Sequence, residues 1–95
     1  FSNTSYFIIF QVNWYLYVLQ CSDGTYYTGV TTNIKRRLGE HNSSSRGAKY
    51  TRGRRPVKVI YSLVYESRSA AQKAENNFKR LTRKQKQRII YDHES

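Results

Sequence analysis

The sequence predicts an α+β domain in which a small three-stranded sheet is covered by about three helices. Two aromatic and aliphatic runs, residues 14–21 and 26–31, flank the turn Ser22-Asp23-Gly24, and a third such run covers residues 57–65. Segments with apolar residues at helical spacing follow the second and the third run. A chain of 95 residues has room for one domain around a single core. We expect that domain over residues 13–91, between an N-terminal extension (1–12) and a short tail (92–95).

The N-terminal extension allows two interpretations. Residues 6–10 form an apolar run with no basic residue before it, which is too short and wrongly flanked for a signal peptide. Either native translation begins at Val12 and residues 1–11 are not native, or the run adds an edge strand; the intact mass of the native protein would decide. No segment has the apolar length of a membrane span, so no membrane partner is expected. The lone Cys21 excludes an internal disulfide and fits a reducing cytoplasm.

The loop of the first hairpin decides which side chains meet. A two-residue Asp-Gly loop would place Tyr17 and Tyr27 on opposite faces of the sheet. A three-residue loop, with Gly24 left-handed in a bulge, places Tyr17 opposite Gly29 and on the same face as Tyr27. The local sequence permits both loops. Because a site shared by the two tyrosines requires the second, we predict the three-residue loop.

The helix after the hairpin carries charged residues on its inward stripe. Thr32 or Asn33 can cap this helix, which runs to about residue 42. Positions i, i+3, i+4 and i+7 form a single stripe made of Ile34, Arg37, Leu38 and His41. The two apolar residues explain why the stripe faces the core. Buried cations are costly unless they are paired or used, so Arg37 and His41 are candidates for chemistry.

The later elements follow from similar signals. Residues 43–55 form a Ser/Gly/basic loop that is too polar to pack. The strand after Pro56 is expected to place four side chains on one face: Val57, Val59, Tyr61 and Leu63. Ser67 or Ser69 begins a second helix, whose apolar line is Ala70, Ala74, Phe78 and Leu81. Thr82 and Gln85 make a capping box for a third, very basic helix that ends near Tyr91.

The chain is strongly basic, with a formal net charge of +11. All 17 Lys and Arg residues lie between Lys35 and Arg88, opposed there only by Glu40, Glu66 and Glu75. A basic half beside a nearly neutral half is the footprint of a polyanion-binding face, so nucleic acid is the expected partner. The basic loop supplies cations and a stacking aromatic, and the later helices add more cations. The predicted contacts are Arg46, Lys49, Tyr50, Arg52, Arg54, Arg55, Lys79, Arg83 and Lys84.

Hydrolysis of a phosphodiester needs a base for the water, charge neutralisation at the phosphate and help for the leaving oxygen. Three carboxylates in the basic region are too few for a two-metal site. Glu75 is the best candidate, since Ala71 and Phe78 are its neighbours on one helix face. One carboxylate supports one hydrated ion, Mg²⁺ or Mn²⁺. The alternative for Glu75 is an ordinary i, i+4 ion pair with Lys79.

These residues resemble the GIY-YIG nuclease family, in particular its small single-domain bacterial members. Leu16-Tyr17-Val18 stands where the family has its first motif, and Tyr27-Thr28-Gly29 matches the second. Arg37 and His41 match the catalytic helix, and Glu75 falls where the metal-binding glutamate is expected. Segments 47–52 and 78–83 also resemble the small members, so the resemblance covers residues 14–90. The first motif lacks its glycine and isoleucine, and the polar residue that often follows the glutamate helix is not assigned.

The resemblance implies a role for each site residue. Tyr17 or Tyr27 would orient or deprotonate the attacking water, together with His41. An unperturbed phenol has a pKa of about 10, so the tyrosine needs a cation nearby to act as a base near neutral pH. Arg37 would hold the scissile phosphate, Glu75 would bind the ion, and Gly29 would keep the strand open where phosphate or a side chain approaches.

We therefore expect a divalent-metal-dependent endonuclease that acts on DNA, favoured over RNA, and leaves 5′-phosphate and 3′-hydroxyl ends. Few groups are placed to read base edges, so structured or single-stranded substrates should be preferred over particular sequences. One rival hypothesis is a non-catalytic module that binds DNA or RNA on the same scaffold. Another is a domain that works only when a protein partner recruits it.

Overall fold

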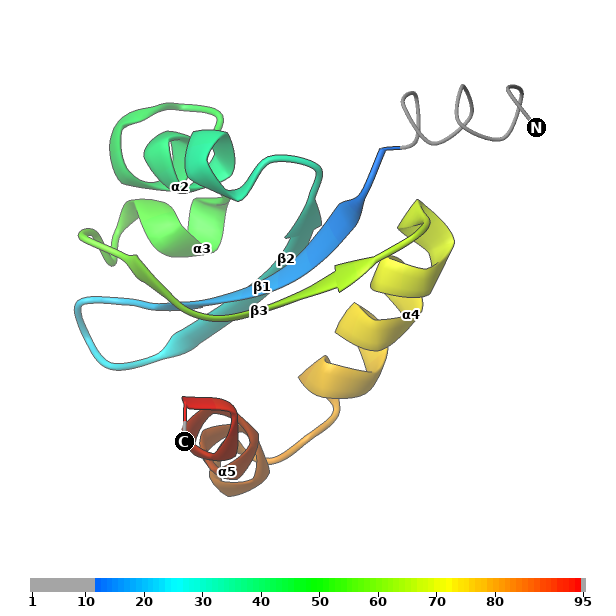
Figure 1. The fold of residues 1–95 in the computed structure, drawn as a ribbon. Helices are drawn as coiled ribbons and strands as arrows, with labels where there is room; N and C mark the ends of the chain where they lie inside the picture. Colours follow the sequence, from blue (N-terminus) through cyan, green and yellow to red (C-terminus); the bar gives the residue numbers. More distant parts are fainter. Residues whose placement is uncertain (1–11, 95) are drawn as a thin grey trace.

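The computed structural model describes residues 12–94, which form a three-stranded antiparallel sheet and four helices (Figure 1). The strands are β1 (Trp14–Gln20), β2 (Tyr26–Thr31) and β3 (Lys58–Tyr65), in the spatial order β2-β1-β3. The helices are α2 (Ile34–Ser43), α3 (Lys49–Arg52), α4 (Arg68–Lys79) and α5 (Arg83–Glu94). The predicted α+β class is confirmed. The two hypotheses for residues 1–11 concern a segment that lies outside the described residues.

The first hairpin has the predicted three-residue loop. Tyr17 pairs with Gly29, and Leu19 pairs with Tyr27. At the end of the hairpin, the amide of Cys21 donates to the carbonyl of Thr25 at 2.8 Å, and Gly24 has φ +84°. Glycine adopts this left-handed conformation without the steric cost that a Cβ would bring. The loop therefore places the two tyrosines on the same face of the sheet.

The sheet separates two apolar clusters. On one face, side chains of β1 and β3 pack with Phe78 of α4 and Ile90 of α5. On the other face, Tyr17, Leu19 and their neighbours pack with Ile34 and Leu38 of α2, as the predicted stripe requires. Helices α2 and α3 thus lie on one side of the sheet, and α4 and α5 lie on the other.

The prediction that one face of β3 carries Val57, Val59, Tyr61 and Leu63 is wrong. The pairing with β1 shifts between Val18 and Leu19, because Leu19 pairs with Val59 whereas Val18 pairs with Tyr61. The extra residue in β3 forms a bulge. Side chains before and after the bulge that would otherwise share one face of the sheet therefore point to opposite faces. Val57 and Val59 therefore pack under α2, and Tyr61 and Leu63 pack under α4 and α5.

The prediction that residues 43–55 are too polar to pack is also wrong. This segment contains the single-turn helix α3, and Gly47 and Thr51 are buried. Polar groups can be buried here because they are paired. The guanidinium of Arg55 donates to the carbonyls of His41 and Ser44, both at 2.6 Å. These are carbonyls that the last turn of α2 leaves without helical partners.

The predicted helix caps are present, and two details differ. Asn33 and Ser67 cap α2 and α4, and Thr82 with Gln85 forms the capping box of α5. The buried residues of α4 are Ala71, Glu75 and Phe78. Ala70 is exposed, so its place in the predicted apolar line is wrong. Helix α5 continues beyond Tyr91 to Glu94. Among the described residues, no helix is long and apolar enough to cross a membrane.

Candidate active site

The hairpin and α2 bring two phenols and an imidazole together on one face of the sheet. The hydroxyl of Tyr17 lies 2.8 Å from Nε2 of His41, and both side chains are buried. The ring of Tyr27 lies 5.1 Å from the ring of His41 and 6.5 Å from that of Tyr17. The register of the hairpin places the tyrosines, and the inward stripe of α2 places His41. This is the group that the sequence predicted.

Gly29 makes room for the phenol of Tyr17. A Cβ at this position would lie 2.6 Å from the Tyr17 hydroxyl and 2.7 Å from Cζ, much closer than real Cβ atoms approach. The side chain of Tyr17 is 2% exposed, so it has little space in which to move away. Only glycine allows the two strands and this phenol to occupy their positions.

Arg37 lies at the edge of this group. Its Nη1 donates to Oε1 of Glu40 at 2.8 Å and to the carbonyl of Arg46 at 2.7 Å. The side chain is a quarter exposed, so it is held by neighbours and still reaches solvent. Its charge acts on the site, because it lowers the pKa of both Tyr17 and His41.

Burial dominates the acid–base properties of the two central groups. Removal from water raises the pKa of Tyr17 to about 12, against the lowering effect of Arg37, and Tyr27 and Glu75 raise it further. Burial also lowers the pKa of His41 to about 4, and the charges of Arg37 and Arg55 act in the same direction. At neutral pH the site therefore contains a protonated phenol and a neutral imidazole.

Glu75 approaches from α4, which packs against β1 and β2. Glu75 is buried, with 7% of the residue exposed, and its carboxylate accepts a hydrogen bond from Nε2 of Gln72. It also forms the i, i+4 ion pair with Nζ of Lys79, at 3.0 Å. Within residues 12–94, no group of three or more His, Cys, Asp or Glu residues could hold a metal ion.

The predicted nucleic-acid contacts divide into several groups. Arg46, Lys49 and Arg52 are exposed in and just before α3. Tyr50 stacks on Tyr27 at 6.1 Å. The guanidinium of Arg54 covers the ring of Tyr50 at 3.9 Å and pairs with Asp23 at 3.1 Å. The guanidinium of Arg55 donates to carbonyls at the end of α2.

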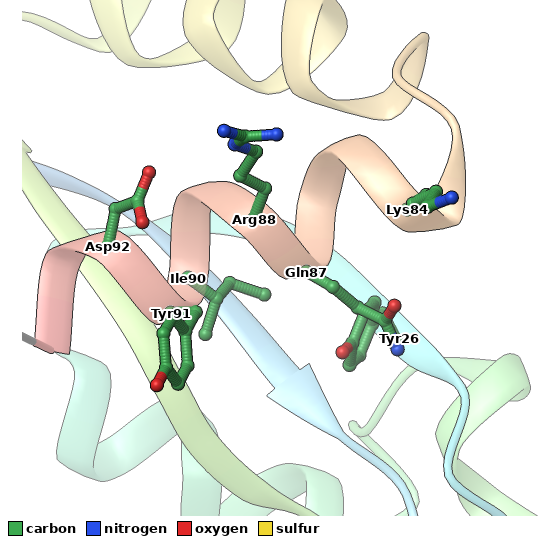
Figure 2. A pocket seen from close by; sticks show the side chains of 7 residues that line it. All are labelled: Tyr26, Lys84, Gln87, Arg88, Ile90, Tyr91 and Asp92. Carbon is green, nitrogen blue, oxygen red and sulfur yellow. The ribbon is translucent and has the colours of Figure 1, made fainter.

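Two of the predicted contacts of the later helices are paired with other parts of the protein. Lys79 pairs with Glu75, and Arg83 donates to the carbonyl of Gly24 and covers the ring of Tyr26. A hollow of about 670 Å³ lies between α5 and the start of β2 (Figure 2). Tyr91, 73% exposed, stands beside it. The other residues that line the hollow are Tyr26, Lys84, Gln87, Arg88, Ile90 and Asp92.

Sequence reasoning did not find Thr51, which completes the site. Its hydroxyl lies 3.0 Å from Nδ1 of His41, and neither side chain is exposed. The amide of Ala48 also lies 3.3 Å from Nδ1. No periodicity links these residues to His41, because the contacts depend on how α3 folds back onto α2.

The protein is a small α+β domain in which the first hairpin and the following helix converge on two tyrosines, an arginine and a histidine. The chain belongs to the GIY-YIG family, since the model of the GIY-YIG catalytic domain matches residues 13–88. The matched residues include the hairpin, α2 and α4, from which the candidate site residues come.

Two sequence relatives and one solved structure match most of this chain. The chain is 53% identical over 81 residues to the UPF0213 protein SAG0778 of Streptococcus agalactiae, covering 85% of this chain and 91% of that one. It is 51% identical over 77 residues to the UPF0213 protein DP2720 of Desulfotalea psychrophila, covering 81% and 70%. The solution structure of EF2693 from E. faecalis is 49% identical with a TM-score of 0.58, covering 87% of this chain and 88% of that one.

Proposed function

We propose that the protein is a divalent-metal-dependent endonuclease that hydrolyses phosphodiester bonds in DNA. The observation that carries this proposal is the buried hydrogen bond between Tyr17 and His41 beside Arg37. Core packing alone does not require these polar groups, and a glycine keeps the strand open where the phenol lies. Membership of the GIY-YIG family supports the same chemistry.

Arg37 is the proposed phosphate ligand. A guanidinium has five N–H donors in a planar fork, and the bonds to Glu40 and Arg46 both use Nη1. Other donors of the group would hold the scissile phosphate. Charge-assisted hydrogen bonds of this kind also stabilise the charge that develops on the equatorial oxygens in the transition state.

Glu75 is the proposed ligand of one Mg²⁺ or Mn²⁺ ion. Mg²⁺ commonly binds one or two carboxylates together with waters and substrate phosphates, so a single carboxylate fits an ion that the substrate helps to hold. Lys79 now pairs with this carboxylate and would move aside. When bound, the ion would supply positive charge for the phosphate and the departing 3′ oxygen.

Two separate basic regions support a preference for structured or single-stranded DNA. One surrounds α3 on the side of the tyrosines and includes Arg46, Lys49 and Arg52. The other lies on α5, on the opposite side of the sheet, where Lys84 and Arg88 line the hollow beside Tyr91 (Figure 2). A straight duplex against the first region leaves the second without a partner, whereas a branched or flexible strand reaches both.

Cleavage assays with a matched carboxylate control test this function. Labelled single-stranded, duplex and branched DNA, and RNA, are incubated with Mg²⁺, Mn²⁺ or EDTA. Glu75→Gln should lower metal-dependent cleavage at least about 100-fold while binding persists, since the neutral amide is a poor Mg²⁺ ligand. Glu66 is exposed at the end of β3, so Glu66→Gln should cleave like wild type.

Other outcomes would change the conclusion. Glu75→Gln that cuts as fast as wild type would rule out the proposed metal ligand. Tight binding without cutting under every condition would favour the non-catalytic binding module. Activity that appears only after a protein fraction is added would favour a domain that depends on a recruiting partner.

A further inference from the structure

The second nitrogen of the His41 ring has its own buried partners. Nδ1 lies 3.3 Å from the amide nitrogen of Ala48 and 3.0 Å from the hydroxyl of Thr51. Gly47 lets the chain approach this closely, since a Cβ there would lie 2.7 Å from the carbonyl oxygen of Glu40. The segment before α3 therefore rests on the last turn of α2 and surrounds the imidazole.

These contacts determine which ring nitrogen carries the hydrogen. A backbone amide can only donate, so the Ala48 contact requires a lone pair on Nδ1. The hydroxyl of Thr51 has a single hydrogen, which lies within reach of both Nδ1 at 3.0 Å and the carbonyl of Ala48 at 2.8 Å. Because that carbonyl also accepts from the amides of Thr51 and Arg52, the hydrogen can turn to Nδ1 when Nδ1 carries a lone pair. The other tautomer would place an Nδ1–H group against the Ala48 N–H group, with two donors facing each other. A neutral imidazole has one ring hydrogen, which must then be on Nε2.

We propose that Ala48 and Thr51 hold His41 as the neutral tautomer protonated on Nε2, so that His41 donates a hydrogen bond to the hydroxyl oxygen of Tyr17. In this state Nε2 has no lone pair, and His41 cannot accept a proton from Tyr17 or from water. Tyr17 accepts this bond and can direct its own hydrogen to another partner, such as the attacking water. Thr51 is a positioning residue, because it acts only through His41.

The charges around the ring agree with a neutral imidazole. Burial and the cations Arg37 and Arg55 lower the pKa of His41, and only Glu40 opposes them. Tyr17, whose raised pKa keeps its phenol protonated near neutral pH, and the ring of Tyr27 face the imidazole from the sheet. The consequence for catalysis rests on the proposed nuclease function, whereas the tautomer itself does not.

Nitrogen NMR of histidine-labelled protein tests the tautomer without any reference to activity. The chain has two histidines, and His93 packs against Tyr61 on the other side of the sheet. His93→Gln therefore leaves one histidine signal and removes the need for assignment. We expect a protonated Nε2 and an unprotonated Nδ1 at pH 7. A protonated Nδ1 would overturn the proposal.

Substitution of Thr51 in the His93→Gln background tests the positioning role. Thr51→Val keeps the shape and removes the hydroxyl that donates to Nδ1, so the share of the Nδ1–H tautomer should rise above that of wild type, although the amide of Ala48 still opposes it. Thr51→Ser keeps the hydroxyl and should restore the wild-type spectrum. If Thr51→Val leaves the spectrum unchanged while the protein is folded, Ala48 alone fixes the tautomer and Thr51 has no positioning role.

Cleavage by two variants of His41 tests the catalytic consequence. The glutamine side chain can place an amide N–H near the position of Nε2, but it cannot act as a base. We expect His41→Gln to retain at least about 10-fold more cleavage than His41→Ala, since a lost donor costs ~100-fold or more. Equal loss in both variants would indicate a base. If wild type cleaves nothing, the nuclease proposal fails and the NMR result still decides the tautomer.

Discussion

Tyr17 experiences opposing effects on its acidity. Burial raises its pKa to about 12, while Arg37 lowers it. At neutral pH the phenol keeps its proton, and below its pKa the phenolate fraction grows about tenfold for each pH unit. If the phenolate assists the water, single-turnover cleavage should rise about tenfold per unit from pH 6 to 9, and Tyr17→Phe should lose this rise. A flat profile in wild type would show that the phenolate is not required.

The buried His41 links stability to pH. Its pKa is about 4 in the folded protein and 6.5 in an unfolded chain, so the unfolded state binds more protons between these values. The contribution of the neutral His41 to folding stability is present above pH 6.5 and is lost as the pH falls toward 4. Urea unfolding should show a loss of roughly 2 kcal/mol from pH 7 to pH 5 through this group. His41→Gln should lose less over the same interval; an equal loss would assign the effect to other groups.

Alanine substitutions of Gly29 and Gly39 should have opposite effects on the free energy of unfolding. Gly29→Ala forces a Cβ against the Tyr17 phenol and should cost about 1–3 kcal/mol of unfolding free energy, because overpacking displaces buried groups. A Cβ at Gly39 in α2 meets nothing within 4 Å, so Gly39→Ala should stabilise by about 0.5–1 kcal/mol. Urea denaturation of both variants checks the pair. If both variants are stabilised equally, the Tyr17 phenol can move away from a Cβ at position 29 at little cost.

At the scale of elements, one side chain joins the end of α2 to the start of β3. Oδ1 of Asn42 accepts from the amide of Val57 at 2.7 Å, and its Nδ2 donates to the Val57 carbonyl at 3.0 Å. Asn42→Ala leaves both partly buried backbone groups without this partner and should cost about 1–3 kcal/mol. Asn76 is exposed on α4, and Asn76→Ala should change stability by less than about 0.5 kcal/mol. Similar urea midpoints for the two variants would refute this role.

At the scale of the whole molecule, the basic surface should make DNA affinity depend strongly on salt concentration. About five phosphate contacts would give a log–log slope near −4 to −5 on duplex DNA. Replacing Lys84 and Arg88 with Gln should reduce the slope on branched DNA by about 2, because each lost contact removes about one unit. Fluorescence titrations at several salt concentrations measure this change. An unchanged slope would show that the hollow on α5 makes no contact with the nucleic acid.

Several parts of the fold were predictable because short-range rules govern them. The inward stripe of α2 and the capping box of Thr82 and Gln85 depend on residues three to seven positions apart. The local sequence permits two hairpin registers, and the structure has the predicted one, in which the tyrosines share a face. The bulge opposite Val18 and Leu19 was missed, because it depends on how β3 meets a strand about forty residues earlier.

The sequence by itself determined the basic character of the chain and the order of its elements, and it predicted the candidate site residues Tyr17, Tyr27, Arg37, His41 and Glu75. Composition and local periodicity are properties of neighbouring residues, so they can be read without a fold. Only the tertiary structure decided that Glu75 pairs with Lys79, that Arg55 closes the end of α2, and that His41 rests against Ala48 and Thr51. Each of these contacts joins a donor and an acceptor that come close only when the chain packs. Which buried polar groups pair with each other therefore depends on their positions in the folded protein.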